Sequence, residues 1–157
     1  MKLEEQIVKE LLEKGYTVTT AESCTGGLLA GRILNVSGAS AVYNEGYITY
    51  SNEAKHRLLG VSNETLELYG AVSEQTAKEM AEGVAKASNA NVGLSTTGIA
   101  GPGGGTPEKP VGLVYVGCSI EGQTIVKKCL FKGDREANRN ASVEEALKLL
   151  QKCLKNQ

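Results

Sequence analysis

Ser23 has the surroundings expected of a nucleophile in acyl transfer. It lies in the segment AESCTGG (21–27), after a short β-branched run and before the helical pattern LLAGRIL. A serine at such a junction places its hydroxyl beside backbone N–H groups that lack an intrahelical partner, and these can stabilise an oxyanion. Gly26 lets a ligand approach the backbone closely. A plain helix N-cap with tight helix packing explains the same pattern, so both interpretations stay open.

A serine nucleophile needs a base, and Lys55 is the better candidate. His56 is the only histidine of the chain, and no feature connects it to Ser23. Lys55 lies in the helix that follows Tyr50, the last residue of a β-like run. As a base it needs burial or a like charge that lowers its pKa from ~10.4 to about 7–8. Tyr50 can relay the proton or hold the amine, whereas a solvated Lys55 in a surface ion pair is the alternative.

Two further segments have the composition of an anion site. The glycine-rich loop TTGIAGPGGGT (96–106) follows a strand, so Gly98 and Gly101 can expose N–H groups as an anion-binding nest. It is neither a Walker A motif nor a dinucleotide fingerprint, because its spacing differs and no GK[ST] closes it. Arg135 and Arg139 share one helical face and can clamp a phosphate. A flexible connection and ordinary surface charge are the alternatives.

The elements that must position these residues alternate between helices and strands. Apolar spacing predicts helices before Gly15, over 28–34, before Gly60, between Ser62 and Gly70, after Ser73 and after Gly133. β-Branched runs predict strands at 16–21, 47–50, 91–97, 111–120 and 124–131, with a hairpin turn at 121–123. This order predicts a single domain over residues 1–157, an α/β/α sandwich around a mixed β-sheet. The strand order does not follow from the sequence.

Composition argues against several classes of function. Hydrophobic residues make up 41% and charged residues 22% of the chain, which is typical of soluble globular proteins. Only 4% of residues are aromatic and the net charge is −1, so we expect no nucleic-acid partner. Four dispersed cysteines and one histidine do not make a zinc set, so we expect no metal. The sequence shows neither a signal peptide nor a membrane segment, and with free thiols this predicts a cytoplasmic protein.

Five long blocks resemble the C-terminal domain of the competence/damage-inducible protein CinA. They are TVTTAESCTGG, VYNEGYITYSNEAKHRLLGV, YGAVSEQTAKEMA, STTGIAGPGGGTPEKPVGLVYVG and FKGDREANR, in the expected order and over nearly the whole chain. Single-domain members of that family are nicotinamide-nucleotide amidases. The resemblance therefore implies deamidation of nicotinamide mononucleotide to nicotinic acid mononucleotide and ammonia, in pyridine nucleotide salvage.

The resemblance also implies roles for individual residues. The family's serine, tyrosine and lysine fall on Ser23, Tyr50 and Lys55, and the reaction needs no metal or other cofactor. We expect substrate contacts at Thr25, Gly26, Gly98, Gly101, Arg135 and Arg139, with Arg139 the first choice for the phosphate. The expected partners are this small nucleotide and further copies of the chain in a homo-oligomer. The alternative is a non-catalytic nucleotide-binding or interaction module linked to competence or the DNA-damage response.

Overall fold

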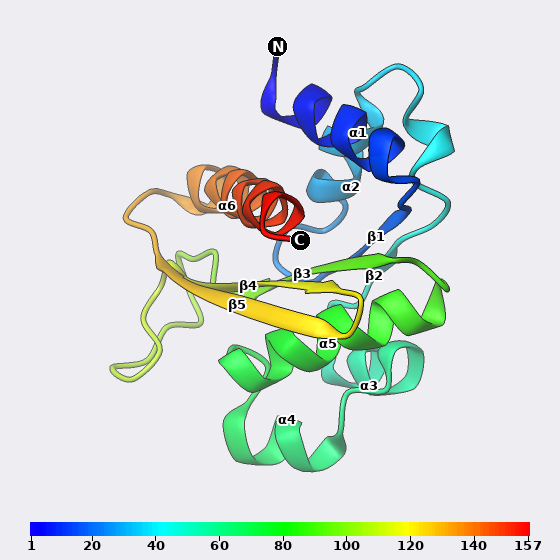
Figure 1. The fold of residues 1–157 in the computed structure, drawn as a ribbon. Coiled ribbons are helices and arrows are strands. Elements are labelled where there is room, and N and C mark those ends of the chain that lie inside the picture. The colour runs from blue at the N-terminus through cyan, green and yellow to red at the C-terminus, as the bar shows by residue number, and fades with distance from the viewer.

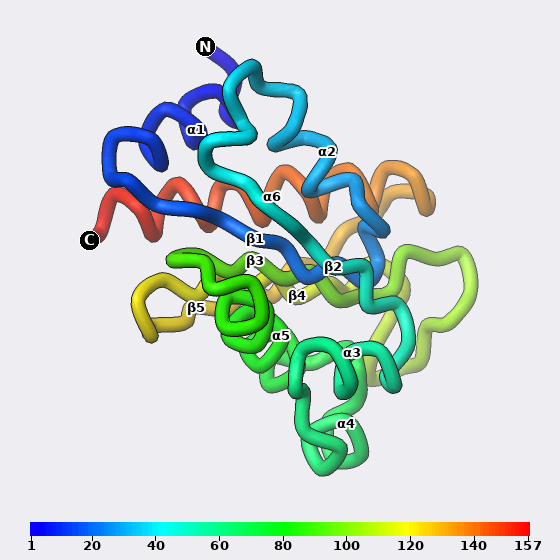
Figure 2. Tube along the Cα trace, turned by 90° about the vertical axis from the view of Figure 1, so that its right-hand side faces the viewer, coloured from blue at the N-terminus to red at the C-terminus, as the bar shows by residue number.

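A five-stranded mixed sheet forms the middle layer of the molecule, and helices cover both of its faces (Figures 1 and 2). The computed structural model describes residues 1–157. Helices α1 (Leu3–Lys14), α2 (Leu28–Leu34) and α6 (Arg135–Lys155) lie on one face, and α3 (Asn52–Leu59), α4 (Asn63–Tyr69) and α5 (Glu74–Ala87) lie on the other. A 3-10 helix, η1 (Ala39–Ala41), follows α2. These layers confirm the predicted sandwich around a mixed sheet.

The strands pair in the order β2-β1-β3-β4-β5. They comprise β1 (Val18–Glu22), β2 (Tyr47–Ile48), β3 (Val92–Gly98), β4 (Leu113–Ile120) and β5 (Gln123–Leu130). Strand β1 is parallel to both β2 and β3, whereas β4 is antiparallel to β3 and β5. Because β1 and β3 are parallel, both end at the same edge of the sheet, and Ser23 and the glycine-rich loop follow them there. In open α/β sheets ligands bind at this carboxyl edge.

Strand β2 is shorter than the predicted 47–50 run. Its pairing with β1 involves only Tyr47 and Ile48, opposite Ala21 and Glu22. One more backbone bond follows, from the Thr49 N–H to the Glu22 carbonyl at 2.9 Å. The chain then turns into α3, which brings the start of that helix next to Ser23.

Two apolar clusters hold the layers together. The larger joins α1, α2 and α6 to the sheet, and Leu94 of β3 and Leu147 of α6 are among its fully buried members. The smaller packs Met80 of α5 against Leu59 of α3. Burying one such side chain stabilises the fold by ~1.5–3 kcal/mol. At Gly83 of α5, an added Cβ would lie 1.9 Å from the Leu59 carbonyl oxygen, so this glycine is what lets α3 pack so closely.

Serine caps fix where the helices on the site's side of the sheet begin. The side chains of Ser51, Ser62 and Ser73 each accept a hydrogen bond from the backbone N–H three residues later. The sequence pattern predicted the last two of these starts, and both are confirmed. The Ser51 cap begins α3 at Asn52, which places Lys55 within the first turn of that helix.

The β4–β5 hairpin is confirmed at the predicted turn. Glu121 and Gly122 both have left-handed backbone angles, with φ of 49° and 82°, as a two-residue type I′ turn requires.

All four cysteines are free and buried. None of the helices combines the length and apolarity needed to cross a membrane.

Candidate active site

Ser23 directly follows β1, at the carboxyl edge of the sheet. Its backbone N–H donates to the Thr96 carbonyl of β3 at 3.0 Å, so the neighbouring strand fixes the backbone that carries the Ser23 hydroxyl. The residue is nearly buried, with 8% of its surface exposed. Residues 24–27 then form a turn before α2 begins at Leu28.

Lys55 approaches Ser23 from α3, in the helical layer on one face of the sheet. Its Nζ lies 3.1 Å from Ser23 Oγ, and it also donates to the carbonyl oxygens of Thr49 at 3.0 Å and Tyr50 at 3.1 Å. Only 1% of the lysine is exposed. No carboxylate pairs with it, and burial lowers its pKa to about 8. The interpretation of Lys55 as a solvated surface residue is therefore wrong for this fold.

The three acceptors around Lys55 define what its neutral form can do. An ammonium group has three donors, and here they point to two carbonyls and one hydroxyl. A neutral amine keeps two N–H donors. The carbonyl oxygens of Thr49 and Tyr50 can only accept hydrogen bonds, so these two donors stay directed at them. The lone pair must then face Ser23, whose hydroxyl is the only one of the three partners that can donate. Removal of one proton from Lys55 therefore makes it a base toward Ser23.

A second candidate nucleophile, the thiol of Cys24, lies beside Ser23 in the same cavity. Burial raises its pKa to about 11, so it stays a neutral thiol near pH 7. A neutral thiol is a poor nucleophile. Lys55 Nζ also bonds to the hydroxyl of Ser23, which favours the serine.

Tyr50 contributes to the site mainly through its backbone. Its carbonyl accepts from Lys55, whereas its phenol hydroxyl makes no hydrogen bond to another residue. The residue is 67% exposed and forms part of the cavity wall. His56 is also removed from the chemistry, because its Nδ1 lies 2.8 Å from the Val61 carbonyl oxygen, at the far end of α3.

A cavity of about 250 Å³ opens in front of these groups. Its walls come from the carboxyl edge of the sheet, α3, the α4–α5 connection and the start of α6: Ser23, Cys24, Tyr50, Lys55, Ala71, Val72, Thr97, Gly98, Ala100 and Arg135. Gly98 ends β3, and an added Cβ there would lie 2.7 Å from the Leu113 carbonyl oxygen. The predicted loop and the predicted nucleophile therefore share one cavity.

The two predicted arginines have different surroundings. Arg135 lines the cavity and donates from Nη1 to the Gly101 carbonyl at 2.7 Å. Arg139 lies behind the turn after Ser23, where Nε donates to the Cys24 carbonyl at 2.9 Å and Nη2 to the Thr25 carbonyl at 3.1 Å. An added Cβ at Gly26 would lie 3.3 Å from Arg139 Nη2. Of the two arginines, only Arg135 lines the cavity.

Sequence reasoning missed two buried polar residues that support the site. Asn138 donates from Nδ2 to the carbonyls of Ala100 and Gly133, both at 3.0 Å, and so fastens the glycine-rich loop to α6. Glu22 is 1% exposed and accepts hydrogen bonds from the amides of Leu29 and Ala30. The available signal was a carboxylate inside a buried strand, directly before the candidate nucleophile.

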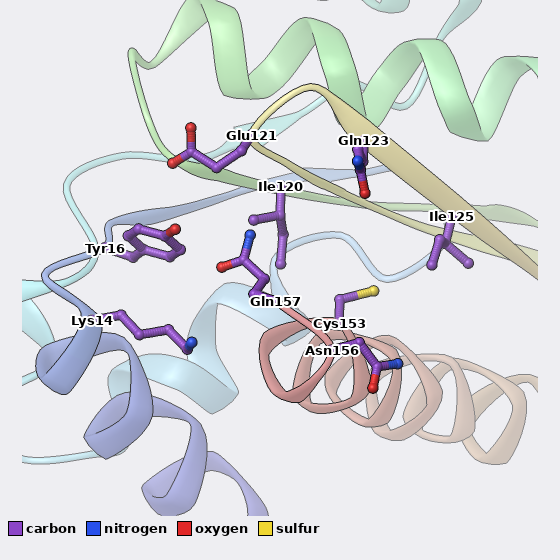
Figure 3. A pocket seen from close by; sticks show the side chains of 9 residues that line it. All are labelled: Lys14, Tyr16, Ile120, Glu121, Gln123, Ile125, Cys153, Asn156 and Gln157. Atoms are coloured by element: carbon purple, nitrogen blue, oxygen red, sulfur yellow. The ribbon is translucent and has the colours of Figure 1, made fainter.

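A larger cavity, of about 470 Å³, lies elsewhere (Figure 3). It is bounded by the end of α1, the end of α6 and the β4–β5 hairpin, with Tyr16 and Cys153 among its walls. Tyr16 precedes β1, whereas Ser23 follows it, so this cavity lies at the other edge of the sheet. None of the predicted site residues lines it.

Comparisons with known proteins agree with the sequence resemblance. The sequence profile of the CinA C-terminal domain matches residues 1–154. A Clostridium botulinum relative named as a competence-damage inducible protein is 56% identical over 153 residues, which is 98% of this chain and 37% of the relative. A CinA-like protein of Kosmotoga olearia is 57% identical over 152 residues, with coverage of 97% and 37%. The chain thus spans little more than a third of the length of these relatives.

Solved structures match over almost the full length. The competence/damage inducible protein CihA of Agrobacterium tumefaciens has a TM-score of 0.94 at 45% identity, covering 99% of this chain and 94% of that one. A CinA superfamily protein of Klebsiella pneumoniae has a TM-score of 0.95 at 35% identity, covering 99% and 97%.

Proposed function

Because the chain belongs to the CinA C-terminal domain family, the family of competence/damage-inducible proteins, we propose that it is the amidohydrolase which the resemblance implies. The substrate is nicotinamide mononucleotide, and the products are nicotinic acid mononucleotide and ammonia. One observation supports this most directly: a buried lysine with its pKa lowered to about 8 lies 3.1 Å from the hydroxyl of Ser23. A serine activated by an adjacent base is the requirement for covalent amide hydrolysis.

In the first half-reaction, Ser23 Oγ attacks the carboxamide carbon while the neutral amine of Lys55 takes the serine proton. The carboxamide oxygen becomes an oxyanion, which the free amides of the turn after Ser23 can stabilise. Lys55 then returns the proton to the leaving nitrogen, the C–N bond breaks and ammonia departs. An acyl-serine remains, and Lys55 is neutral again.

In the second half-reaction, water attacks the acyl carbon and Lys55 takes its proton. The tetrahedral intermediate collapses, the bond to Ser23 Oγ breaks and Lys55 returns the proton to the serine. The acid product gives its remaining proton to solvent and leaves as a carboxylate. The protons that move to and from Ser23 and the leaving nitrogen all pass through Lys55 Nζ, and the carbonyls of Thr49 and Tyr50 hold that amine in place throughout.

The rest of the nucleotide extends over the cavity wall. Arg135 is the cation at the mouth of the cavity, and the glycine-rich loop after Gly98 lies beside it. A phosphate between the two would meet a guanidinium and backbone N–H groups. We assign Arg135 as the phosphate contact and give Arg139 a role in holding the turn, which reverses the order favoured by the sequence.

An ammonia-release assay on the purified chain with nicotinamide mononucleotide tests the proposal. We expect turnover that a chelator does not change and one equivalent of nicotinic acid mononucleotide per ammonia. Binding of the nucleotide without release of ammonia would contradict the amidase and favour the non-catalytic nucleotide-binding module.

A further inference from the structure

Glu22, the last residue of β1, has a buried carboxylate with an unusual set of partners. The amides of Leu29 at 2.8 Å and Ala30 at 3.0 Å donate to its two oxygens, and the hydroxyl of Thr25 donates to Oε1 at 2.5 Å. No lysine or arginine pairs with it. The first turn of α2 therefore stabilises the buried negative charge of Glu22, since a helix N-terminus favours negative charge.

This arrangement decides which amides remain free beside the nucleophile. Glu22 occupies the amides of Leu29 and Ala30, and the Leu28 amide donates to the Thr25 carbonyl, so the first amides of α2 cannot bind an oxyanion. In contrast, the amides of Thr25, Gly26 and Gly27 donate to no acceptor within the chain. Gly26 and Gly27 both have left-handed backbone angles, with φ of 54° and 104°. Consecutive amides in such a turn form a concave donor surface for an anion.

The hydroxyl of Thr25 connects Glu22 to the neighbouring strand. Thr25 gives its proton to Glu22, so at 2.8 Å it accepts one from the hydroxyl of Thr96. All three side chains are at most 1% exposed. The buried chain Thr96–Thr25–Glu22 ties the turn to both β3 and α2, and it allows one orientation of the Thr25 hydroxyl.

Arg139 fixes the same turn from the other side. Its guanidinium binds the carbonyl oxygens of Cys24 and Thr25. In a trans peptide the N–H of the next residue points opposite to the carbonyl. The amides of Thr25 and Gly26 must therefore point away from Arg139.

We propose that Glu22 is a positioning residue of the amidase: through Thr25 and the first turn of α2, its carboxylate holds the turn 23–27 so that the amides of Thr25 and Gly26 receive the oxyanion formed at Ser23. This role rests on the proposed function, because the oxyanion forms in the proposed amidase reaction. The geometry of the turn can also be tested by a binding probe that requires no turnover. Glu22 itself touches neither the substrate nor Ser23 Oγ.

Pyridine-3-boronic acid is the probe, because boron replaces the carboxamide carbon. Attack by Ser23 Oγ forms a B–O bond, the serine proton passes to Lys55, and trigonal boron becomes a tetrahedral anion that resembles the intermediate. Boron-11 NMR detects that change, and titration gives its dissociation constant. In parallel, ammonia release gives kcat and KM for nicotinamide mononucleotide.

Glu22→Gln is the principal variant because it preserves size and one acceptor but places an NH2 group against the Ala30 amide. We expect kcat to fall by about 100-fold, the size of effect seen when an oxyanion donor is lost, with KM within about threefold. Boronate affinity should fall by a similar factor. Thr25→Val should show the same losses of kcat and boronate affinity. Thr25→Ser keeps the hydroxyl and should therefore retain most of the wild-type kcat. Thr124→Val removes a comparable hydrogen bond to Glu82, 2.7 Å long and at the hairpin, and should change neither readout.

A folded Glu22→Gln protein with wild-type kcat and boronate affinity would overturn the proposal. If Glu22→Gln does not fold, equal kcat for Thr25→Val and Thr25→Ser would overturn it, and a loss confined to Thr25→Val would support it. A wild type that forms the tetrahedral adduct but releases no ammonia refutes the proposed substrate alone, and loss of the adduct in Glu22→Gln still supports positioning. Absence of any adduct in the wild type overturns the positioning role together with the nucleophile.

Discussion

The amine of Lys55 donates a hydrogen bond to the hydroxyl of Ser23 at 3.1 Å, across 32 positions of sequence. One residue lies at the carboxyl edge of the sheet and the other in the first turn of α3, on the helical layer that covers one face. Because two backbone carbonyls take the other donors of Lys55, the proposed mechanism activates Ser23 only when this lysine is neutral.

The first prediction is a rise of kcat/KM with pH, half complete near pH 8. Below that value Lys55 is an ammonium without a lone pair, and above it the neutral amine can take the serine proton. Initial rates of ammonia release from about pH 6 to about pH 9.5 measure the profile. A flat profile would exclude Lys55 as the base. The same lowered pKa should increase the free energy of unfolding between pH 8 and 10.5, because the unfolded chain there keeps the proton that the folded Lys55 has lost.

The second prediction is that Lys55→Arg is nearly inactive at every pH. A guanidinium keeps the positive charge but stays protonated at any workable pH, so it cannot accept the serine proton. Nucleotide binding should stay within about tenfold of wild type, or ~1.4 kcal/mol, by titration calorimetry. An active Lys55→Arg enzyme would exclude Lys55 as the base and leave a bound water as the next candidate.

The third prediction separates the two nucleophiles of the cavity. Ser23→Ala should lose several orders of magnitude in kcat while it still binds nucleotide. Cys24→Ala is the matched comparison and should lose less than about tenfold, because the neutral thiol takes no part in the reaction. The reverse order of losses would identify Cys24 as the nucleophile.

The fourth prediction concerns the two arginines. Arg135→Ala should weaken binding of nicotinamide mononucleotide by about 1.5–3 kcal/mol and leave the phosphate-free riboside almost unaffected. Arg139→Ala should instead lower kcat for both ligands, because it releases the carbonyls of Cys24 and Thr25. Equal binding losses for the two ligands in Arg135→Ala would remove that residue from the phosphate site.

The fifth prediction is that Tyr50→Phe stays active, with a far smaller loss than Lys55→Arg. The Tyr50 carbonyl holds Lys55 and survives the substitution, whereas the hydroxyl bonds to no other residue. We expect kcat within about tenfold, equivalent to ~1.4 kcal/mol, and an unchanged pH midpoint. A much larger loss, or a shifted midpoint, would show that the hydroxyl relays the proton in the substrate complex.

Local patterns in the sequence determined the elements and their order. Serine caps, the Gly15 helix end, the β-branched runs and the hairpin turn at Glu121 and Gly122 all depend on residues close in sequence, so their physics can be read from one segment. The same holds for Ser23 after a strand and for the α/β class. The family blocks then indicated which of these residues could act together.

Only the tertiary structure decided how those residues meet. Strand order, the burial of Lys55 and the separate positions of Arg135 and Arg139 depend on contacts between distant segments, and a lowered pKa follows from such burial. Glu22 illustrates the difference, because a glutamate in the sequence suggests an exposed surface charge. Pairing of β1 with strands on both sides buries it, and amides in the first turn of α2 then donate hydrogen bonds to its carboxylate, beside Ser23.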